Sequence, residues 1–243
     1  MLAGALGVFA VGMALGFLGA GGTTIALPVL VYLVGLDAHA AVAVSIVLVG
    51  GASAYGAVLN AREGFVDWRA VAVFAPAGVA GAVLGSAWSY MLSGRTLLIC
   101  FGGLVTVVAV RMMLEGGETT ASSRLRLGSA VVAGFGIGVL TGVLGNGGGF
   151  LLVPGLVYLA GLPMRRAVGT SLLISAINSA AAFAGHAARQ KLPWRMVLVL
   201  LACTIIGITA GVALSHRTDP GRLRHYFAWM LLVLAGYLLW RNW

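Results

Sequence analysis

Long apolar stretches separated by short polar loops constrain the fold of this chain more than any other feature. Only 9% of its 243 residues are charged and 60% are hydrophobic, which is more apolar surface than a water-soluble domain of this size can bury. An α-helix needs about 20 apolar residues to cross the roughly 30 Å hydrocarbon core of a bilayer. We therefore predict an all-α integral membrane protein with eight long spans: Leu2–Gly19, Ala40–Leu59, Ala70–Leu92, Thr96–Leu114, Leu127–Leu144, Ala167–Ala188, Met196–Leu214 and Tyr226–Trp240.

Two further apolar pieces are too short for a comfortable crossing. Thr24–Leu36 and Phe150–Leu162 have 13 residues each, and an α-helix rises only about 1.5 Å per residue. Each piece follows a glycine cluster, "GAGGTT" in the first case and "GNGGGF" in the second. We predict two short broken or re-entrant helices that begin at Thr23 or Thr24 and at Gly149 or Phe150.

The sequence matches itself without a gap at an offset of 126 residues. About 20 of the 54 positions from Gly16 to Arg69 are identical to their counterparts, including glycines of both clusters, Pro28 with Pro154 and Ser45 with Ser171. This match predicts two homologous repeats, 1–114 and 127–243, joined by a polar linker, 115–126.

Loop charges favour an inverted second repeat. If each half crosses the membrane an odd number of times, ten of the fifteen basic residues gather on one side, whereas parallel repeats split them about nine to six. An excess of Lys and Arg marks the cytoplasmic side, so we expect both termini outside. The ten are Arg62, Arg69, Arg111, Arg124, Arg126, Arg165, Arg166, Arg217, Arg222 and Arg224, and the other five are Arg95, Arg189, Lys191, Arg195 and Arg241.

The two glycine clusters are the predicted binding site. Inverted repeats characteristically place substrate near the midplane, where broken helices present exposed backbone groups. The start of each short helix offers N–H groups and the positive end of a helix dipole, which suit an anion. The predicted backbone site comprises Gly21, Gly22, Thr23, Thr24, Asn146, Gly147, Gly148 and Gly149. Close helix packing explains other glycines, such as Gly12 with Gly16 and Gly134 with Gly138, well enough.

Polar side chains within the spans add to this site. No Asp or Glu lies inside a predicted long span, so an anionic or neutral substrate is more plausible than a cation. Ser171, Ser175 and Asn178 share one face of a helix, with Thr170 beside them and Ser45 as the counterpart of Ser171. Hydroxyls in membrane helices also bond to backbone or to neighbouring helices, so a structural role stays open. His186, near a span end, is a candidate for proton-dependent gating, against a solvated interfacial histidine.

Other classes of site and function have little support. Cys100 and Cys203 lie in apolar spans without a CxxC or a histidine cluster, so we expect buried thiols rather than a disulfide or a metal site. The chain carries none of the HExxH, GxSxG or Walker patterns, and we predict neither enzymatic activity nor a cofactor. The net charge of +9 comes from residues between spans and therefore does not indicate nucleic acid.

The repeated blocks also resemble a known family. Both halves carry GxGG followed by five residues and a proline (Gly19–Pro28, Gly145–Pro154), then "AVAVS" or "AVGTS", and then Trp-Arg after the next loop. This pattern resembles the TauE/SafE family over nearly the whole chain. The resemblance implies a small bacterial inner-membrane permease of two four-helix repeats that moves sulfite or sulfonates such as sulfoacetate. Its motif positions correspond to Gly19, Gly21, Gly22, Pro28, Gly145, Asn146, Gly147, Gly148, Pro154, Thr170 and Ser171.

The first half departs from the fuller family pattern. Ala20 stands opposite Asn146, and Ala43 and Val44 stand opposite Gly169 and Thr170. The resemblance therefore implies that the second half supplies more of the direct substrate contacts.

The glycine clusters by themselves predict only an anion site near the midplane. The resemblance adds the substrate class and implies a secondary transporter, an exporter of a small sulfur-containing anion, in the bacterial inner membrane. The expected mechanism is alternating access around a midplane site. A passive anion channel and a membrane subunit without transport are the alternatives. We expect a small anion and the lipid bilayer as partners, and a homodimer is compatible with the sequence.

Overall fold

The computed structural model describes residues 2–88, 94–114, 127–144, 148–186 and 194–242, and within these ranges every regular element is a helix. Two short α-helices, α2 (Thr23–Tyr32) and α7 (Leu152–Tyr158), each follow a 3-10 turn, η1 (Gly19–Gly22) and η2 (Gly148–Leu151). The long helices are α1 (Leu2–Leu18), α3 (Ala38–Arg62), α4 (Trp68–Trp88), α5 (Gly94–Leu114), α6 (Leu127–Leu144), α8 (Met164–His186), α9 (Trp194–Arg217) and α10 (Pro220–Asn242).

The predicted all-helical architecture is confirmed. Each predicted long span falls on one long helix, and the two short pieces fall on α2 and α7. The α-helical part of α7 begins at Leu152 rather than at Gly149 or Phe150, because Gly148–Leu151 form the tighter 3-10 turn. The predicted linker, 115–126, lies outside the described residues.

Length and hydropathy identify membrane-spanning candidates among the described residues. Three stretches qualify on both criteria: Ala40–Arg62, Trp68–Gly85 and Trp194–Arg217. Gly4–Leu18, Val105–Leu114 and Gly149–Tyr158 are shorter apolar helical stretches. The apolar helices agree with a membrane protein, and the count of eight spans stays a prediction.

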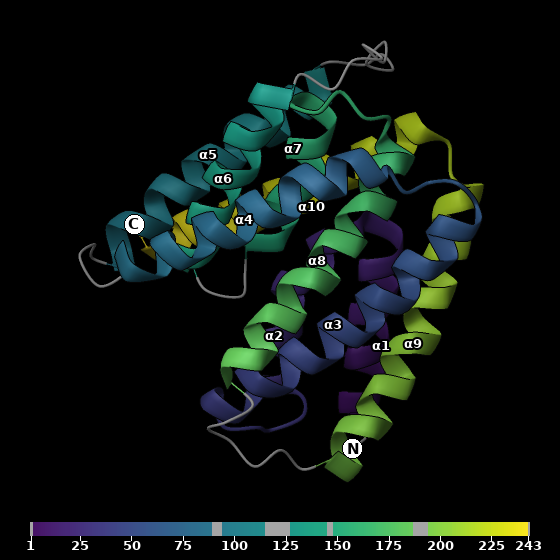
Figure 1. The fold of residues 1–243 in the computed structure, drawn as a ribbon. Coiled ribbons are helices and arrows are strands. Elements are labelled where there is room, and N and C mark those ends of the chain that lie inside the picture. The colour runs from purple at the N-terminus through teal and green to yellow at the C-terminus, as the bar shows by residue number, and fades with distance from the viewer. Residues whose placement is uncertain (1, 89–93, 115–126, 145–147, 187–193, 243) are drawn as a thin grey trace.

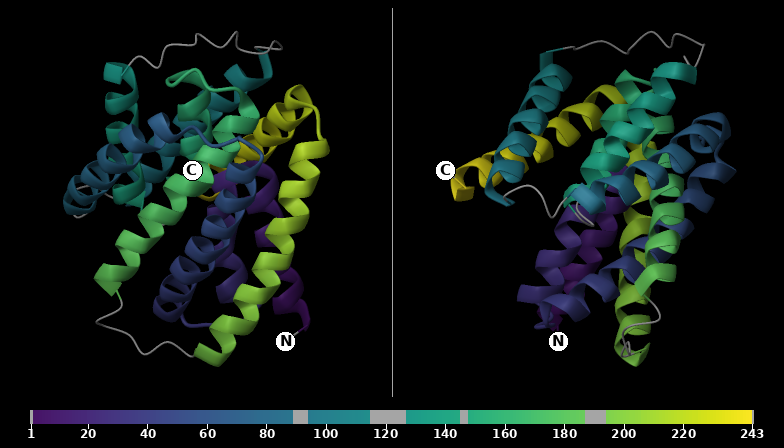
Figure 2. Two further views of the ribbon diagram at one scale, coloured as in Figure 1. Left: turned by 45° about the vertical axis from the view of Figure 1, so that its right-hand side comes forward. Right: turned by 60° about the vertical axis from the view of Figure 1, so that its left-hand side comes forward.

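The helices gather into two groups that cross at an angle (Figure 1). One group contains α1, α2, α3, α8 and α9, and the other contains α4, α5, α6, α7 and α10. The closest pairs are α1 with α9, α4 with α6, α3 with α8 and α5 with α10 (Figure 2). Every one of these pairs joins a helix from the first half of the chain to one from the second. The two halves therefore interlock instead of folding as separate bodies.

Glycines allow the backbones of α1 and α9 to touch. Gly12 and Gly16 lie against the carbonyl oxygens of Thr204 and Ile208. In return, Gly207 of α9 lies against the carbonyl oxygen of Phe9. A Cβ atom at any of these glycines would clash with the facing backbone, so the packing interpretation of Gly12 and Gly16 is confirmed.

The same arrangement joins α4 to α6. Gly81 and Gly85 lie against the carbonyl oxygens of Phe135 and Val139, and Gly138 lies against that of Gly78. A Cβ at Gly134 would lie 3.1 Å from Phe74 Cα, which again supports packing. Gly12 and Gly138 are 126 residues apart, as are Gly81 and Gly207. Close backbone contact matters in membrane proteins because lipid satisfies apolar side chains as well as another helix does.

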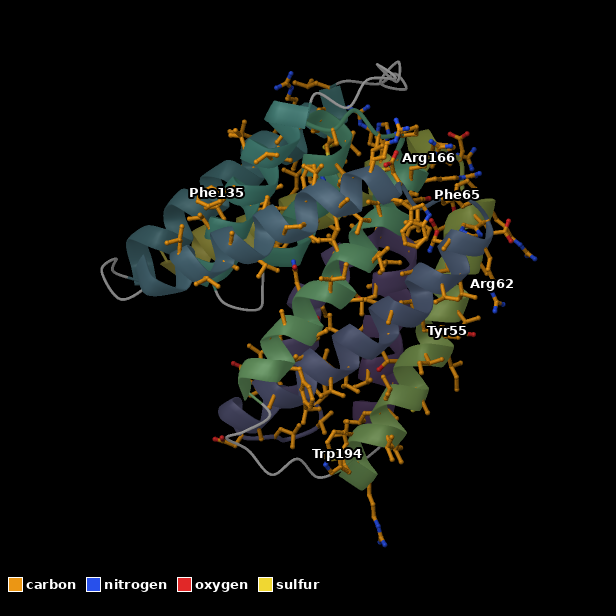
Figure 3. The ribbon with its side chains drawn as sticks, viewed as in Figure 1. Tyr55, Arg62, Phe65, Phe135, Arg166 and Trp194 are labelled. Atoms are coloured by element: carbon orange, nitrogen blue, oxygen red, sulfur yellow. The ribbon has the colours of Figure 1, made fainter. Side chains whose placement is uncertain are left out.

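Helices α3 and α8 run antiparallel across the middle of the molecule. A Cβ at Gly50 would lie 2.8 Å from Ser179 Cβ, and one at Gly169 would lie 2.9 Å from Asn60 Cβ. Residue numbers therefore rise along α3 as they fall along α8. Figure 3 shows Arg62, Phe65 and Arg166 at one end of this group of helices and Trp194 at the opposite end.

Both short helices end in the same kind of turn. The Leu36 N–H donates to Leu30 O at 3.1 Å, and the Leu162 N–H donates to Leu156 O at 3.0 Å. Gly35 and Gly161, with φ of 79° and 69°, supply the left-handed residue that such a turn needs. These turns again lie 126 residues apart.

A leucine at Gly138 should disrupt the contact between α4 and α6. Overpacking of a close contact costs about 1–3 kcal/mol, and here the facing atoms are backbone that cannot move aside. We expect Gly138→Leu to lower the melting temperature of the detergent-purified protein by several degrees. Gly103→Leu, at a helical position with no atom within 4 Å of the added Cβ, is the matched control and should leave it unchanged. Equal melting temperatures for both variants would contradict the packing role.

Candidate functional site

The fold brings described parts of the two glycine clusters together. The turns η1 and η2 contact each other, η1 also contacts α7 and α8, and η2 contacts α2. Gly21 and Gly22 lie in η1, and Gly148 and Gly149 lie in η2. The predicted residues Asn146 and Gly147, with Gly145, lie outside the described residues. The candidate site therefore lies between the two halves of the chain, where both helix breaks meet.

Ser171 joins α8 to the first glycine cluster. The Ala20 N–H donates a hydrogen bond to Ser171 Oγ at 3.2 Å, and Ser171 Oγ donates to Val168 O at 2.8 Å. Gly19 has a φ of +73°, and a Cβ there would lie 2.5 Å from Ser171 Oγ. Ala20 and Ser171 are both fully buried. A buried hydroxyl of the second half thus touches the backbone of the break in the first half.

Thr170 is hydrogen-bonded to a different element from its neighbour Ser171. Its hydroxyl accepts a hydrogen bond from the Asp67 N–H at 3.0 Å. The Asp67 carboxylate in turn accepts one from the Ala70 N–H at 2.9 Å, which caps the start of α4. Thr170 therefore fastens the start of α4 to α8, and the structure does not bring its hydroxyl to the glycine clusters as Ser171 is brought.

The other predicted polar residues lie along α3 and α8. Ser45 is buried and donates to Val42 O at 2.7 Å, which repeats the bond of its counterpart Ser171. Ser175 is buried, and Asn178 is half-buried. The Asn178 Oδ1 atom is itself buried and accepts no hydrogen bond from the described residues. An unsatisfied buried amide oxygen is costly, so Asn178 stands out as a group that a ligand or water could satisfy.

Three predicted residues are described through their backbone alone. Thr23 and Thr24 form the first turn of α2, and His186 is the last residue of α8. The gating role predicted for His186 stays a prediction.

The described surroundings of the two turns are largely apolar. Phe150, Leu151, Leu152 and Val153 are all buried in one hydrophobic cluster with Ala20. A helix start carries a partial positive charge, and a low-dielectric environment strengthens its attraction for an anion. Among the described residues, no group of three or more His, Cys, Asp or Glu could hold a metal. The arrangement suits binding of an anion by dipoles and hydroxyls.

The structure adds a polar cluster that the sequence did not indicate. His216 Nε2 lies 3.1 Å from Asn60 Oδ1, and the His216 ring meets that of Phe65 edge-on at 5.0 Å. Arg165 donates to Thr218 O at 2.9 Å and lies 5.9 Å from the Phe65 ring centroid. These contacts tie the end of α3 and the start of α8 to the end of α9. Periodicity could not reveal them, because each contact joins segments far apart in sequence.

Gly19→Ala should be more damaging than Gly35→Ala. Both positions have positive φ, so each variant carries a left-handed backbone cost of about 1–2 kcal/mol. Only at Gly19 does the added Cβ also meet another group, Ser171 Oγ, whereas nothing lies within 4 Å at Gly35. We expect a lower melting temperature for Gly19→Ala than for Gly35→Ala, and partial recovery in Gly19→Ala/Ser171→Ala. Equal losses at the two glycines would show that the Ser171 contact is absent.

Comparisons with known proteins agree with this architecture. Residues 4–238 match the family described as "Sulfite exporter TauE/SafE". A "Probable membrane transporter protein" of Xylella fastidiosa (strain 9a5c) is 32% identical over 96% of this chain and 92% of its own length. The "Probable membrane transporter protein YdhB" of Bacillus subtilis (strain 168) is 24% identical over 96% of this chain and 97% of its own.

No solved structure gives a significant match. The family match and the Xylella relative both extend over nearly the whole chain, including both glycine clusters and the helices that hold them. Together with the apolar helices, they indicate a multi-pass membrane protein. The chain belongs to the TauE/SafE family of membrane transporters.

Proposed function

We propose that this protein is a secondary transporter that exports a small sulfur-containing anion, sulfite or an organosulfonate such as sulfoacetate, by alternating access. The family description, "Sulfite exporter TauE/SafE", supports the substrate class. The observation that carries the mechanism is the contact of Ser171 with Gly19 and Ala20. Through it, the break in the first half is held by a helix of the second. The turn η1 also contacts η2 and α7, so movement of one group of helices against the other must alter the site.

The proposal treats residues 1–114 and 127–243 as two inverted repeats. An axis in the membrane plane turns equivalent helices to opposite directions. The antiparallel course of α3 and α8, which are equivalent under the 126-residue offset, supports this relation. The paired packing of α1 with α9 and of α4 with α6 supports it too, because the offset exchanges one pair with the other. Inversion needs an odd number of crossings in each half, so α2 and α7 must return the chain to the side on which α1 and α6 begin. The contact of Gly4 with Val34, just after α2, supports this for the first half.

Charge gives the proposed orientation. Arg62 and Arg69 flank one loop, while Arg165 and Arg166 begin α8 at the same end, near the end of α9. Basic residues favour the cytoplasmic side, so we assign this end to the cytoplasm of a bacterial cell. The termini of the chain then lie on the outer side of the inner membrane.

The proposed substrate site is built from backbone and amide groups. N–H groups after Gly22 and Gly148 hold the anion, and Asn146 and Asn178 supply side-chain donors. Ser171, whose hydroxyl donates to Val168 O, holds the first turn in place. Thr170 contributes indirectly, by fixing the start of α4 beside the site. In so apolar a setting, an anion loses its hydration and must receive several hydrogen bonds in exchange. An oxyanion, which accepts bonds on each of its oxygens, meets that requirement.

Transport in liposomes tests the proposal. Purified protein should show sulfite counterflow, in which trapped unlabelled anion drives transient accumulation of labelled anion. Asn146→Ala and Gly148→Leu should lower the rate at least tenfold, because each removes a donor or blocks approach to the helix start, where one lost hydrogen bond to a charged group costs about 1.5–3 kcal/mol. Gly103→Leu is the matched control for folding and insertion.

The same assay separates the alternatives. A passive anion channel would give flux without counterflow accumulation, and a non-transporting subunit would give neither. Parental rates in both Asn146→Ala and Gly148→Leu would place the site elsewhere.

A further inference from the structure

The two short helices occupy equivalent sequence positions but unequal surroundings. On one face they match, since Ala26 and Leu30 of α2 are as buried as their counterparts Leu152 and Leu156 of α7. On the two flanks of that face they differ. Ile25 and Leu27 are 40% and 36% exposed, whereas their counterparts Leu151 and Val153 are 4% and 0% exposed. Both flanks are therefore covered at the start of α7 and open at the start of α2.

Helices α5 and α10 contact the end of α7 through Tyr158, whereas the rest of α7 packs mainly against α8, α6 and the two 3-10 turns. The hydrophobic cluster that contains Leu151 and Val153 also contains residues of α5 and α10, which are Val105, Ala109, Met112, Leu223, Phe227, Ala228, Leu231 and Ala235. The clusters that bury Ala26 and Leu30 are instead formed with residues of α1, α3, α8 and α9. The α5–α10 pair therefore shares a hydrophobic cluster with α7 and not with α2. The surroundings of the two halves are for this reason not equivalent.

Arg111, Tyr158 and Arg224 form a polar clasp that joins α5 and α10 to the end of α7. The Arg111 and Arg224 guanidinium carbons lie 5.5 Å and 5.6 Å from the Tyr158 ring centroid, one from α5 and one from α10. Arg224, only 6% exposed, also donates a hydrogen bond to Tyr158 Oη at 2.8 Å. Cation–π contacts and a charge-assisted hydrogen bond both strengthen on burial.

The sequence of the other half does not provide the same three side chains. Tyr32, which is 126 residues before Tyr158, is 76% exposed. The positions equivalent to Arg111 and Arg224 are Tyr237 and Leu98, and neither carries a charge. A contact present on only one of two related halves favours one of the two conformations that such a pair can exchange.

We propose that Arg111, Tyr158 and Arg224 form a latch that holds α7 closed against α5 and α10, and that the latch opens when the transporter switches to its opposite state. This inference rests on the proposed alternating access. In an inverted-repeat transporter, one half's conformation in one state is taken by the other half in the opposite state. Release of Tyr158 is then the step that lets α7 become as open as α2 is here.

Cysteine accessibility tests the latch without any substrate. The full chain is reconstituted in liposomes with Cys100→Ala and Cys203→Ala, and Ala160→Cys, buried just beyond α7, serves as reporter. The measurement is its rate of modification by a charged, membrane-impermeant methanethiosulfonate on the arginine-rich side. Tyr158→Phe keeps the ring but removes the acceptor for Arg224, and we expect about tenfold faster labelling from the loss of one such bond. Arg224→Gln should act in the same direction.

Two controls separate a latch from general loosening. Tyr32→Phe, the equivalent change in the other half, should leave the rate at Ala160→Cys unchanged. A second reporter, Ala57→Cys, is buried on α3 near its arginine-rich end and should label slowly in every variant. Unchanged labelling of Ala160→Cys in both Tyr158→Phe and Arg224→Gln would overturn the latch, and so would equal acceleration at Ala57→Cys.

The result is independent of substrate identity. If sulfite counterflow fails but Tyr158→Phe selectively exposes Ala160→Cys, the latch stands and the substrate assignment falls. If counterflow succeeds and labelling does not change, the transporter stands and the latch falls.

Discussion

Backbone contact at glycines, between helices of opposite halves of the chain, is the constraint on which the rest of the structure depends. Gly12 and Gly207 bring α1 against α9, and Gly81 and Gly138 bring α4 against α6. Since lipid is as apolar as another helix, such contacts must come from close approach and dispersion rather than from the hydrophobic effect. Each half completes its packing with a helix from the other. This exchange fixes how α3 and α8 cross and therefore where the two glycine clusters meet.

The candidate site follows from that crossing. On α8, neighbouring residues point about 100° apart, so Thr170 reaches the start of α4 while Ser171 reaches the 3-10 turn after α1. Helix α8 of the second half is thus bonded both to the turn η1 and to the start of α4 in the first half. In the proposed transporter this dual attachment couples movement of the two groups of helices to the geometry of the site. The unequal cover of α2 and α7 fits a molecule at rest in one of two related conformations.

The sequence predicted the helical segments well because each is an apolar run bounded by loops, and it identified Gly12, Gly16, Gly134 and Gly138 as packing residues. It could not predict which helix each glycine touches. The long helices are apolar on most faces, so amphipathic periodicity gives no direction for packing. Sequence spacing placed Thr170 with Ser171, and only the tertiary contact with Asp67 separates their roles. The 126-residue match likewise predicted equivalent short helices, whereas α5 and α10 contact Tyr158 at the end of α7 and the equivalent Tyr32 is exposed. The predicted contributions of Asn146 and Gly147 stay predictions.

Opposite orientation of the two halves is the central claim, and the sidedness of one equivalent pair tests it most directly. Arg69 and Arg195 lie 126 residues apart and are both exposed near the starts of α4 and α9. Single cysteines at these two positions, in the cysteine-free chain, can be labelled by an impermeant thiol reagent in intact cells and in inverted vesicles. The account predicts that Arg195→Cys reacts from outside and Arg69→Cys from the cytoplasmic side. Reaction of both from the same side would contradict it.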